Sequence, residues 1–274
     1  GIAFDPTDSN TIYMTGSAGG ILKTTDGGAN WSMQGDGIPY PYAGPIAVCP
    51  TDRNVVLVGT GDYDGGLGTG YGVMRSVDGG GSWEWVASNV IQSAAFSAIV
   101  FDPDNSNRIL ASTSRGIWKS ENQGLTWAQI TTNGNLDLNF SALSVGKARN
   151  AGGRLYVASC LRQGSGVYGV YYSTDLGATW SRDANFPVGT NMARLQITTS
   201  AVDGDVVYAV QGGVRKVFRG VFNGSGFTWT DITGNFPNGF DSTNTYNWSQ
   251  QSYDMHISAA AHTVNGNVRD DVYV

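Results

Sequence analysis

Three aspartates lie in long irregular segments of the sequence, Asp62 and Asp64 in one and Asp254 in another. Two carboxyl groups roughly 5 to 10 Å apart can cleave a glycosidic bond, one as the acid and the other as nucleophile or base. The segment Asp62–Gly66 also offers oxygen ligands for calcium, although fewer than a recognised calcium loop supplies. These three aspartates are therefore the candidate catalytic residues; we expect no cofactor, with calcium as a minor alternative.

Several arginines and aromatic residues fall in similar irregular segments. A guanidinium group can hold a carboxylate or sulfate through two parallel hydrogen bonds, but a solvated surface arginine is the ordinary alternative. Aromatic rings with polar edges suit sugar faces, or they simply fix their own loops. The predicted ligand-binding residues are Tyr63, Arg115, Arg162, Arg194, Arg215, Tyr246, Trp248 and Tyr253. The other rings in these segments are Tyr40, Tyr42, Tyr71, Phe96, Phe140, Tyr168 and Phe240.

The composition excludes several classes of function. The net charge is −6, so the basic surface that binds nucleic acid is missing. Two histidines and two cysteines have no zinc-binding spacing, and we expect no metal site. No apolar run is long enough to span a membrane. Among the 22 acidic residues 20 are aspartate, lysine is scarce and glycine is abundant, which favours strands and tight turns over helices.

One short pattern recurs along the chain. It ends in a tryptophan each time, and the distances between successive tryptophans are 52, 44, 53 and 49 residues. This spacing is typical of a four-stranded propeller blade. The four clear copies are 24–31, 76–83, 120–127 and 173–180, and a degenerate fifth ends at Trp229. The sequence thus predicts an all-β propeller.

A second element precedes each copy: an apolar strand, a turn rich in Asp, Asn and Pro, and another strand. Examples are Ile2–Pro6, Ile46–Pro50 and Ile99–Pro103. Together the two elements give blades at about 1–34, 44–88, 96–131, 140–183 and 193–232. A sixth begins with strands near 256–261 and 271–274. We expect residues 1–274 to form a single propeller domain, incomplete at one or both ends, within a ring of six to eight blades.

The repeated turn is predicted to be a folding device, in which the acidic or amide side chain accepts backbone N–H groups and the tryptophan packs between sheets. Its residues are Asp26, Trp31, Asp78, Trp83, Asn122, Trp127, Asp175 and Trp180. The pattern Ser/Thr-x-Asp-x-Gly-x-Thr-Trp resembles the Asp-box, or BNR, repeat of sialidases, xyloglucanases and sortilin-like propellers. Gly59–Asp62, Tyr71–Val73 and Gln251–Asp254 extend the similarity to secreted bacterial propellers labelled glycosyl-hydrolase-like or sortilin-like.

In an up-and-down blade, the repeated turns share one end and the long irregular connections share the other, where function usually resides. The resemblance implies a secreted or cell-surface protein whose long-loop face binds an extracellular polysaccharide or a protein without catalysis. The alternative is a glycoside hydrolase. A xyloglucanase-like enzyme is favoured over a sialidase, because neither Glu84 nor Glu121 falls on this face.

Two further expectations concern positions. Strand direction places Cys49 and Cys160 at opposite ends of different blades, so both are predicted to be free thiols. The longest connection holds Tyr246, Trp248 and Tyr253, and we expect it to form a lid or rim over the long-loop face.

Overall fold

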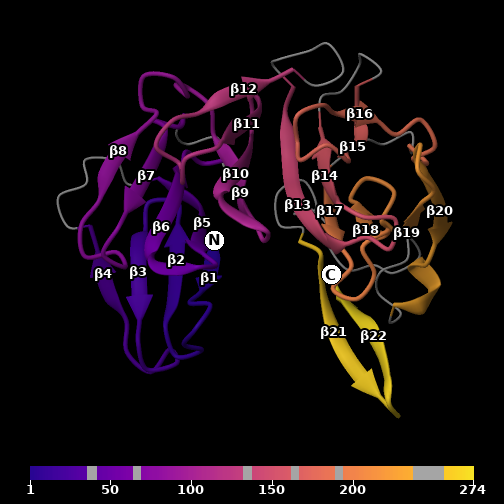
Figure 1. Ribbon diagram of the computed structural model, residues 1–274, viewed down its shortest axis with the longest axis horizontal. Coiled ribbons are helices and arrows are strands. Elements are labelled where there is room, and N and C mark those ends of the chain that lie inside the picture. Colours follow the sequence, from indigo (N-terminus) through magenta and orange to yellow (C-terminus); the bar gives the residue numbers. More distant parts are fainter. Residues whose placement is uncertain (36–41, 64–68, 132–137, 162–166, 189–193, 237–255) are drawn as a thin grey trace. The chain divides into compact units, whose positions relative to one another are not determined.

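A computed structural model describes residues 1–35, 42–63, 69–131, 138–161, 167–188, 194–236 and 256–274. The chain forms two compact units, Gly1–Ile130 and Thr131–Val274. Each unit consists of antiparallel sheets in which strands that follow one another along the chain lie side by side (Figure 1).

The first unit contains three four-stranded sheets, which we call blades 1 to 3. Blade 1 comprises β1 (Ile2–Phe4), β2 (Ile12–Gly16), β3 (Gly20–Thr24) and β4 (Ser32–Gln34). Blade 2 comprises β5 (Ala43–Cys49), β6 (Asp52–Thr60), β7 (Val73–Ser76) and β8 (Glu84–Val86). Blade 3 comprises β9 (Phe96–Asp102), β10 (Asn105–Thr113), β11 (Gly116–Ser120) and β12 (Ala128–Ile130).

The second unit contains two four-stranded sheets, blades 4 and 5, and a hairpin. Blade 4 comprises β13 (Phe140–Ala148), β14 (Arg154–Cys160), β15 (Gly169–Ser173) and β16 (Ser181–Arg182). Blade 5 comprises β17 (Leu195–Thr199), β18 (Val206–Gln211), β19 (Lys216–Phe222) and β20 (Phe227–Asp231), followed by a 3-10 turn at Thr233–Asn235. The hairpin consists of β21 (Ser258–Val264) and β22 (Asn267–Tyr273).

These strands confirm the predicted limits of the five complete blades, but the limits predicted for the last two strands were wrong. We expected strands near 256–261 and 271–274, whereas β21 and β22 extend to Val264 and start at Asn267. Asn265 and Gly266 join them with positive φ values of 51° and 79°. Asn-Gly favours a two-residue hairpin turn, so the strands continue up to it.

The second strand of most blades is buried on both faces. Its sequence is therefore a continuous apolar run, as in Val55–Val58 of β6 and Leu155–Ala158 of β14. The strand β2 instead alternates, with Tyr13 and Thr15 buried between more exposed neighbours. A strand whose two faces are both covered requires a continuous apolar run. A strand with one covered face requires only alternating apolar and polar residues.

Neighbouring blades within each unit share apolar cores. Tyr13 and Ile21 of blade 1 pack with Ile46, Val56 and Met74 of blade 2. Similar cores join blades 2 and 3, blades 4 and 5, and blade 5 with the hairpin. Burial of these side chains supplies the main stabilisation of such a stack.

Four turns between the third and fourth strands of a blade have the same hydrogen-bond pattern. We call them box turns: 24–31, 76–83, 120–127 and 173–180. In each, a buried Ser or Thr hydroxyl donates to Oδ1 of the Asp or Asn two residues later, over 2.7 to 3.0 Å. That Oδ1 atom accepts the backbone N–H four residues further on. The tryptophan Nε1 donates to a glycine carbonyl of the same turn.

Box turns also receive side chains from the preceding blade. Tyr13 Oη and Lys23 Nζ of blade 1 both donate to the carbonyl of Gly79, over 2.8 and 2.7 Å. Arg75 of blade 2 donates to the carbonyl of Gln123, over 3.1 Å. The turns therefore fix not only their own blade but its packing against the blade before it.

The degenerate fifth copy of the pattern does not form a box turn. The turn between β19 and β20 ends at Gly226, and Trp229 lies inside β20 instead of before it. Its Nε1 donates to Asp183 Oδ2, over 2.7 Å, and not to a glycine carbonyl. The prediction that Trp229 ends a repeat was therefore wrong. The fifth copy lacks the Ser/Thr-x-Asp pair that holds the other turns.

Both cysteines are buried free thiols, as predicted. Cys49 ends β5 and Cys160 ends β14.

Acidic pH should weaken the box turns. Hydrogen bonds from Asn30 lower the pKa of Asp26, and those from Ser82 lower that of Asp78, each from 3.8 to about 2. A lowered pKa in the folded state stabilises the fold above the unfolded value, and the contribution is lost as pH falls toward the folded value. The melting temperature should therefore drop between about pH 4 and pH 2.

The matched variant carries both Asp26→Asn and Asp78→Asn, since Asn122 occupies the equivalent place in the third box turn. Its melting temperature should depend less on pH in this window. An unchanged pH profile in differential scanning calorimetry would contradict the assignment.

Candidate functional site

The order of strands places the predicted ligand-binding residues at one end of each sheet, opposite the box turns. Asp62 and Tyr63 follow β6, and Arg115 lies between β10 and β11. Arg194 precedes β17, and Arg215 lies between β18 and β19. We call this the long-loop end. Six predicted residues lie outside the described part of the chain: Asp64, Arg162, Tyr246, Trp248, Tyr253 and Asp254.

Asp62 lies where backbone segments of blades 2 and 3 converge. It is 9% exposed, directly after Gly61, whose N–H donates to the carbonyl of Tyr42 over 3.0 Å. The neighbouring Thr60 hydroxyl donates to the carbonyl of Gly72 and accepts the N–H of Tyr71, both over 2.8 Å. This network holds the chain on either side of the segment that carries the carboxyl group.

Gly61 allows the close approach. Its φ is 99°, and an added Cβ would lie 2.8 Å from both Ala95 Cα and Gly70 N. A side chain at this position would therefore meet backbone atoms that cannot easily move.

In the second unit, a shared glycine links the segments that carry two of the predicted arginines. Gly212 N–H donates to the carbonyl of Arg194, and Arg215 N–H donates to the carbonyl of Gly212. Arg194 is buried, and Arg215 has a positive φ of 54°. Desolvation and the charge of Arg194 lower the pKa of the His256 imidazole. The backbone of Gly212 thus joins the segments that carry the two arginines.

Three of the aromatic residues in the long segments belong to the core. Phe96, Phe140 and Tyr168 are at most 3% exposed. Burial raises the pKa of Tyr168 to about 12. Tyr71, in contrast, is 51% exposed and meets the Trp85 ring edge-on at 5.1 Å. Of these four rings, only Tyr71 is available to a ligand.

Both glutamates lie away from the long-loop end, as predicted. Glu84 begins β8 and pairs with Arg75, over 2.9 Å. Glu121 lies in a box turn and pairs with Lys119 and Arg108. In the described residues, no three His, Cys, Asp or Glu side chains are placed to share a metal ion. Nor does any described helix have the length and apolar character needed to cross a membrane.

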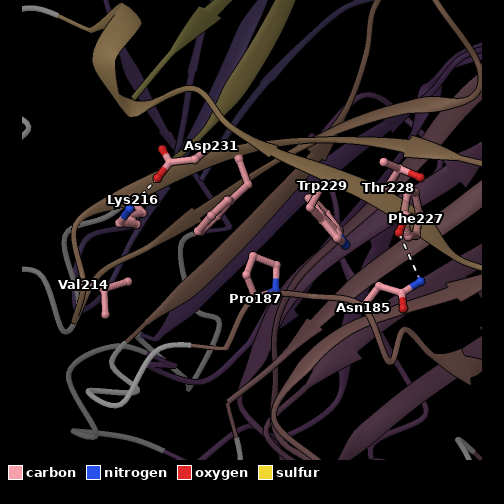
Figure 2. A pocket seen from close by; sticks show the side chains of 9 residues that line it. Asn185, Pro187, Val214, Lys216, Phe227, Thr228, Trp229 and Asp231 are labelled. Atoms are coloured by element: carbon pink, nitrogen blue, oxygen red, sulfur yellow. Dashed lines mark hydrogen bonds and ion pairs between the residues drawn. The ribbon is translucent and has the colours of Figure 1, made fainter.

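A groove of about 700 Å³ in the second unit contains none of the residues predicted from the sequence. Figure 2 shows side chains from β19, β20 and the segment after β16 around it. The lining residues are Asn185, Pro187, Val214, Lys216, Phe218, Phe227, Thr228, Trp229 and Asp231. The sequence signal that could have located this groove is the alternation of residues 216 and 218 on β19 and of 227, 229 and 231 on β20.

Comparison with known proteins agrees with this architecture. A family model described as the DUF6242 beta propeller domain matches residues 104–230. An ancestral GH74 enzyme has a TM-score of 0.66 and 23% identity over 85% of this chain and 31% of its own. The fold is a β-propeller. The structure of YCF48 bound to D1 peptide, at 14% identity and a TM-score of 0.56, shares the propeller over 84% of this chain and 66% of its own.

The curated relatives that match this chain are xyloglucanases. The xyloglucanase of Hypocrea jecorina is 28% identical over 256 aligned positions, and the match covers 85% of this chain and 26% of the relative. A xyloglucanase from a Paenibacillus species is 24% identical over 69% of this chain and 21% of its own length. The propeller thus spans about a quarter of the curated relatives it matches.

The position of Asp62 should depend on Gly61. Gly61→Ala is expected to destabilise the protein by at least about 2 kcal/mol, because strain at positive φ adds to a clash with backbone. Gly16→Ala is the matched control, since no atom lies within 4 Å of a Cβ added there. Equal free energies of unfolding for the two variants in urea would contradict the close approach.

Proposed function

We propose that this chain is part of a glycoside hydrolase that cleaves a β-glucan, with xyloglucan as the first substrate to test. The support is the similarity to xyloglucanases over 69 to 85% of the chain. The catalytic alternative is therefore better supported than non-catalytic ligand binding. Because such polysaccharides occur outside cells, the proposal includes export of the protein.

The observation that carries the proposal is the position of Asp62. Asp62 is 9% exposed and follows β6 at the long-loop end, where a propeller normally carries its site. Partial withdrawal from water strengthens the interactions of a carboxyl group with a substrate. Asp62 thus becomes the first of the two carboxyl groups that hydrolysis requires.

Cleavage needs one carboxyl group to protonate the departing oxygen and another to attack the sugar or activate water. Asp64 and Asp254 are proposed for the second role. Tyr63, Arg115, Arg194 and Arg215 are proposed to contact the glycan or its substituents. The same proposal covers Arg162, Tyr246, Trp248 and Tyr253.

We also propose that the box turns belong to the Asp-box class. Their shared hydrogen bonds between hydroxyl, carboxyl and backbone groups support this. In this proposal Asp26, Asp78 and Asp175 have structural roles and take no part in catalysis.

The test measures reducing ends released from xyloglucan, mixed-linkage β-glucan and carboxymethylcellulose by the whole protein. Asp62→Asn should lower the rate by at least about 100-fold, the usual loss when a general acid or base is removed. Asp26→Asn is the matched control and should leave the rate unchanged. An asparagine side chain fits this position, because Asn122 occupies the equivalent place in the third box turn.

If the Asp62→Asn variant releases reducing ends at the wild-type rate, Asp62 is not a catalytic residue. If the wild-type protein binds these polysaccharides but releases no reducing ends, non-catalytic binding replaces the proposal.

A further inference from the structure

We propose that the groove beside Trp229 is a saccharide-binding subsite for a neutral β-glucan segment. The inference rests on the proposed function in its choice of ligand. It uses residues of the second unit that the sequence analysis did not assign to a ligand-binding site. We call it the Trp229 groove, lined by the nine residues given above.

One face of blade 5 builds the wall of this groove. Lys216 and Phe218 alternate along β19, and Phe227, Trp229 and Asp231 alternate along β20. Alternate residues of a strand point to the same side of a sheet, so these five side chains share a face. Asn185 and Pro187, from the segment after β16, lie beside them (Figure 2).

The Trp229 ring is held in place before any ligand arrives. It lies over Gly220, its partner on β19, where an added Cβ would come within 2.8 Å of Cζ3. Its Nε1 donates to Oδ2 of Asp183, which is 1% exposed and accepts Phe227 N–H at Oδ1. Phe186 meets the ring edge-on at 5.0 Å. A ring fixed in this way loses little entropy on binding.

The chemistry of the lining fits a neutral sugar. A pyranose presents apolar C–H faces and a rim of hydroxyl groups, which requires aromatic surface flanked by hydrogen-bonding groups. Trp229 supplies the aromatic surface, whereas Phe218 and Phe227 are only 5% and 1% exposed and form the apolar wall behind it. Asn185, Thr228, Lys216 and Asp231 supply polar groups around them.

Charge and size narrow the ligand class. Lys216 and Asp231 form an ion pair in which both side chains remain substantially exposed, so their charges cancel while their polar atoms stay accessible. Among the described residues no other member of the lining is charged, so these residues give an anionic ligand no net attraction. The volume of about 700 Å³ lies within the usual range for small-molecule sites.

The test titrates cellotetraose and a xyloglucan heptasaccharide into the Asp62→Asn protein, so that hydrolysis does not interfere. Calorimetry gives the affinity, and the indole N–H signal of Trp229 in NMR spectra locates the event. Adding Trp229→Ala should weaken binding at this site at least tenfold, as for a central aromatic anchor. The matched control is Trp31→Ala, which removes another partly exposed tryptophan and should leave the affinity unchanged.

A second variant keeps the core contacts of Trp229. Val214→Trp fills the groove from the turn between β18 and β19 and should cause the same loss, even if Trp229→Ala fails to fold. Wild-type affinity in Val214→Trp, or an unshifted Trp229 signal at saturating oligosaccharide, would overturn the inference.

The outcomes separate the two proposals. Cleavage that depends on Asp62, with no effect of the groove variants on binding, rejects the groove and leaves the hydrolase. Loss of binding in the groove variants without any cleavage by the wild-type protein retains the groove and rejects the hydrolase.

Discussion

The hydroxyl group that opens each box turn is the interaction on which the blades depend. Thr24, Ser76, Ser120 and Ser173 are at most 2% exposed, and each hydroxyl both donates to a side-chain oxygen and accepts a backbone N–H. A hydroxyl group withdrawn from water, and the backbone groups beside it, must find partners. One short side chain meets much of that demand, so the turn can close within the packed stack.

Packing between blades follows from this closure. The fixed turns present the carbonyl groups of Gly79 and Gln123 to Tyr13, Lys23 and Arg75 of the preceding blade. Where the turn lacks the pattern, in blade 5, a tyrosine still reaches it: Tyr172 donates to the carbonyl of Ser225. Hydrogen bonds at this end and apolar cores between sheets together make each stack rigid.

Rigidity at one end leaves the opposite end open to variation. Asp62, Arg194 and Arg215 come directly before or after strands whose positions are set by the stack. The fold itself supports many chemistries, so activity must be argued from such residues and not from the propeller. Blade 5 differs from the other blades in its last turn. There Trp229 lies within β20 instead of before it, and its ring lines the groove.

The sequence by itself determined the local features of this protein. The spacing of the repeated tryptophans predicted the limits of five blades. In blades 1 to 4 the signal is local, because each box turn is closed by partners within seven residues. Asn265 and Gly266 are an equally local signal, because Asn-Gly favours a two-residue hairpin turn.

Only the tertiary structure decided which aromatic residues are buried and which line a surface. Phe96, Phe140 and Tyr168 are in the core, while Trp229 lines a groove. The partners that settle this are far away in the chain: Asp183 is 46 residues from Trp229, and Gln211 is 43 residues from Tyr168. Burial depends on which blades come together, and a short sequence pattern contains no information about such distant neighbours.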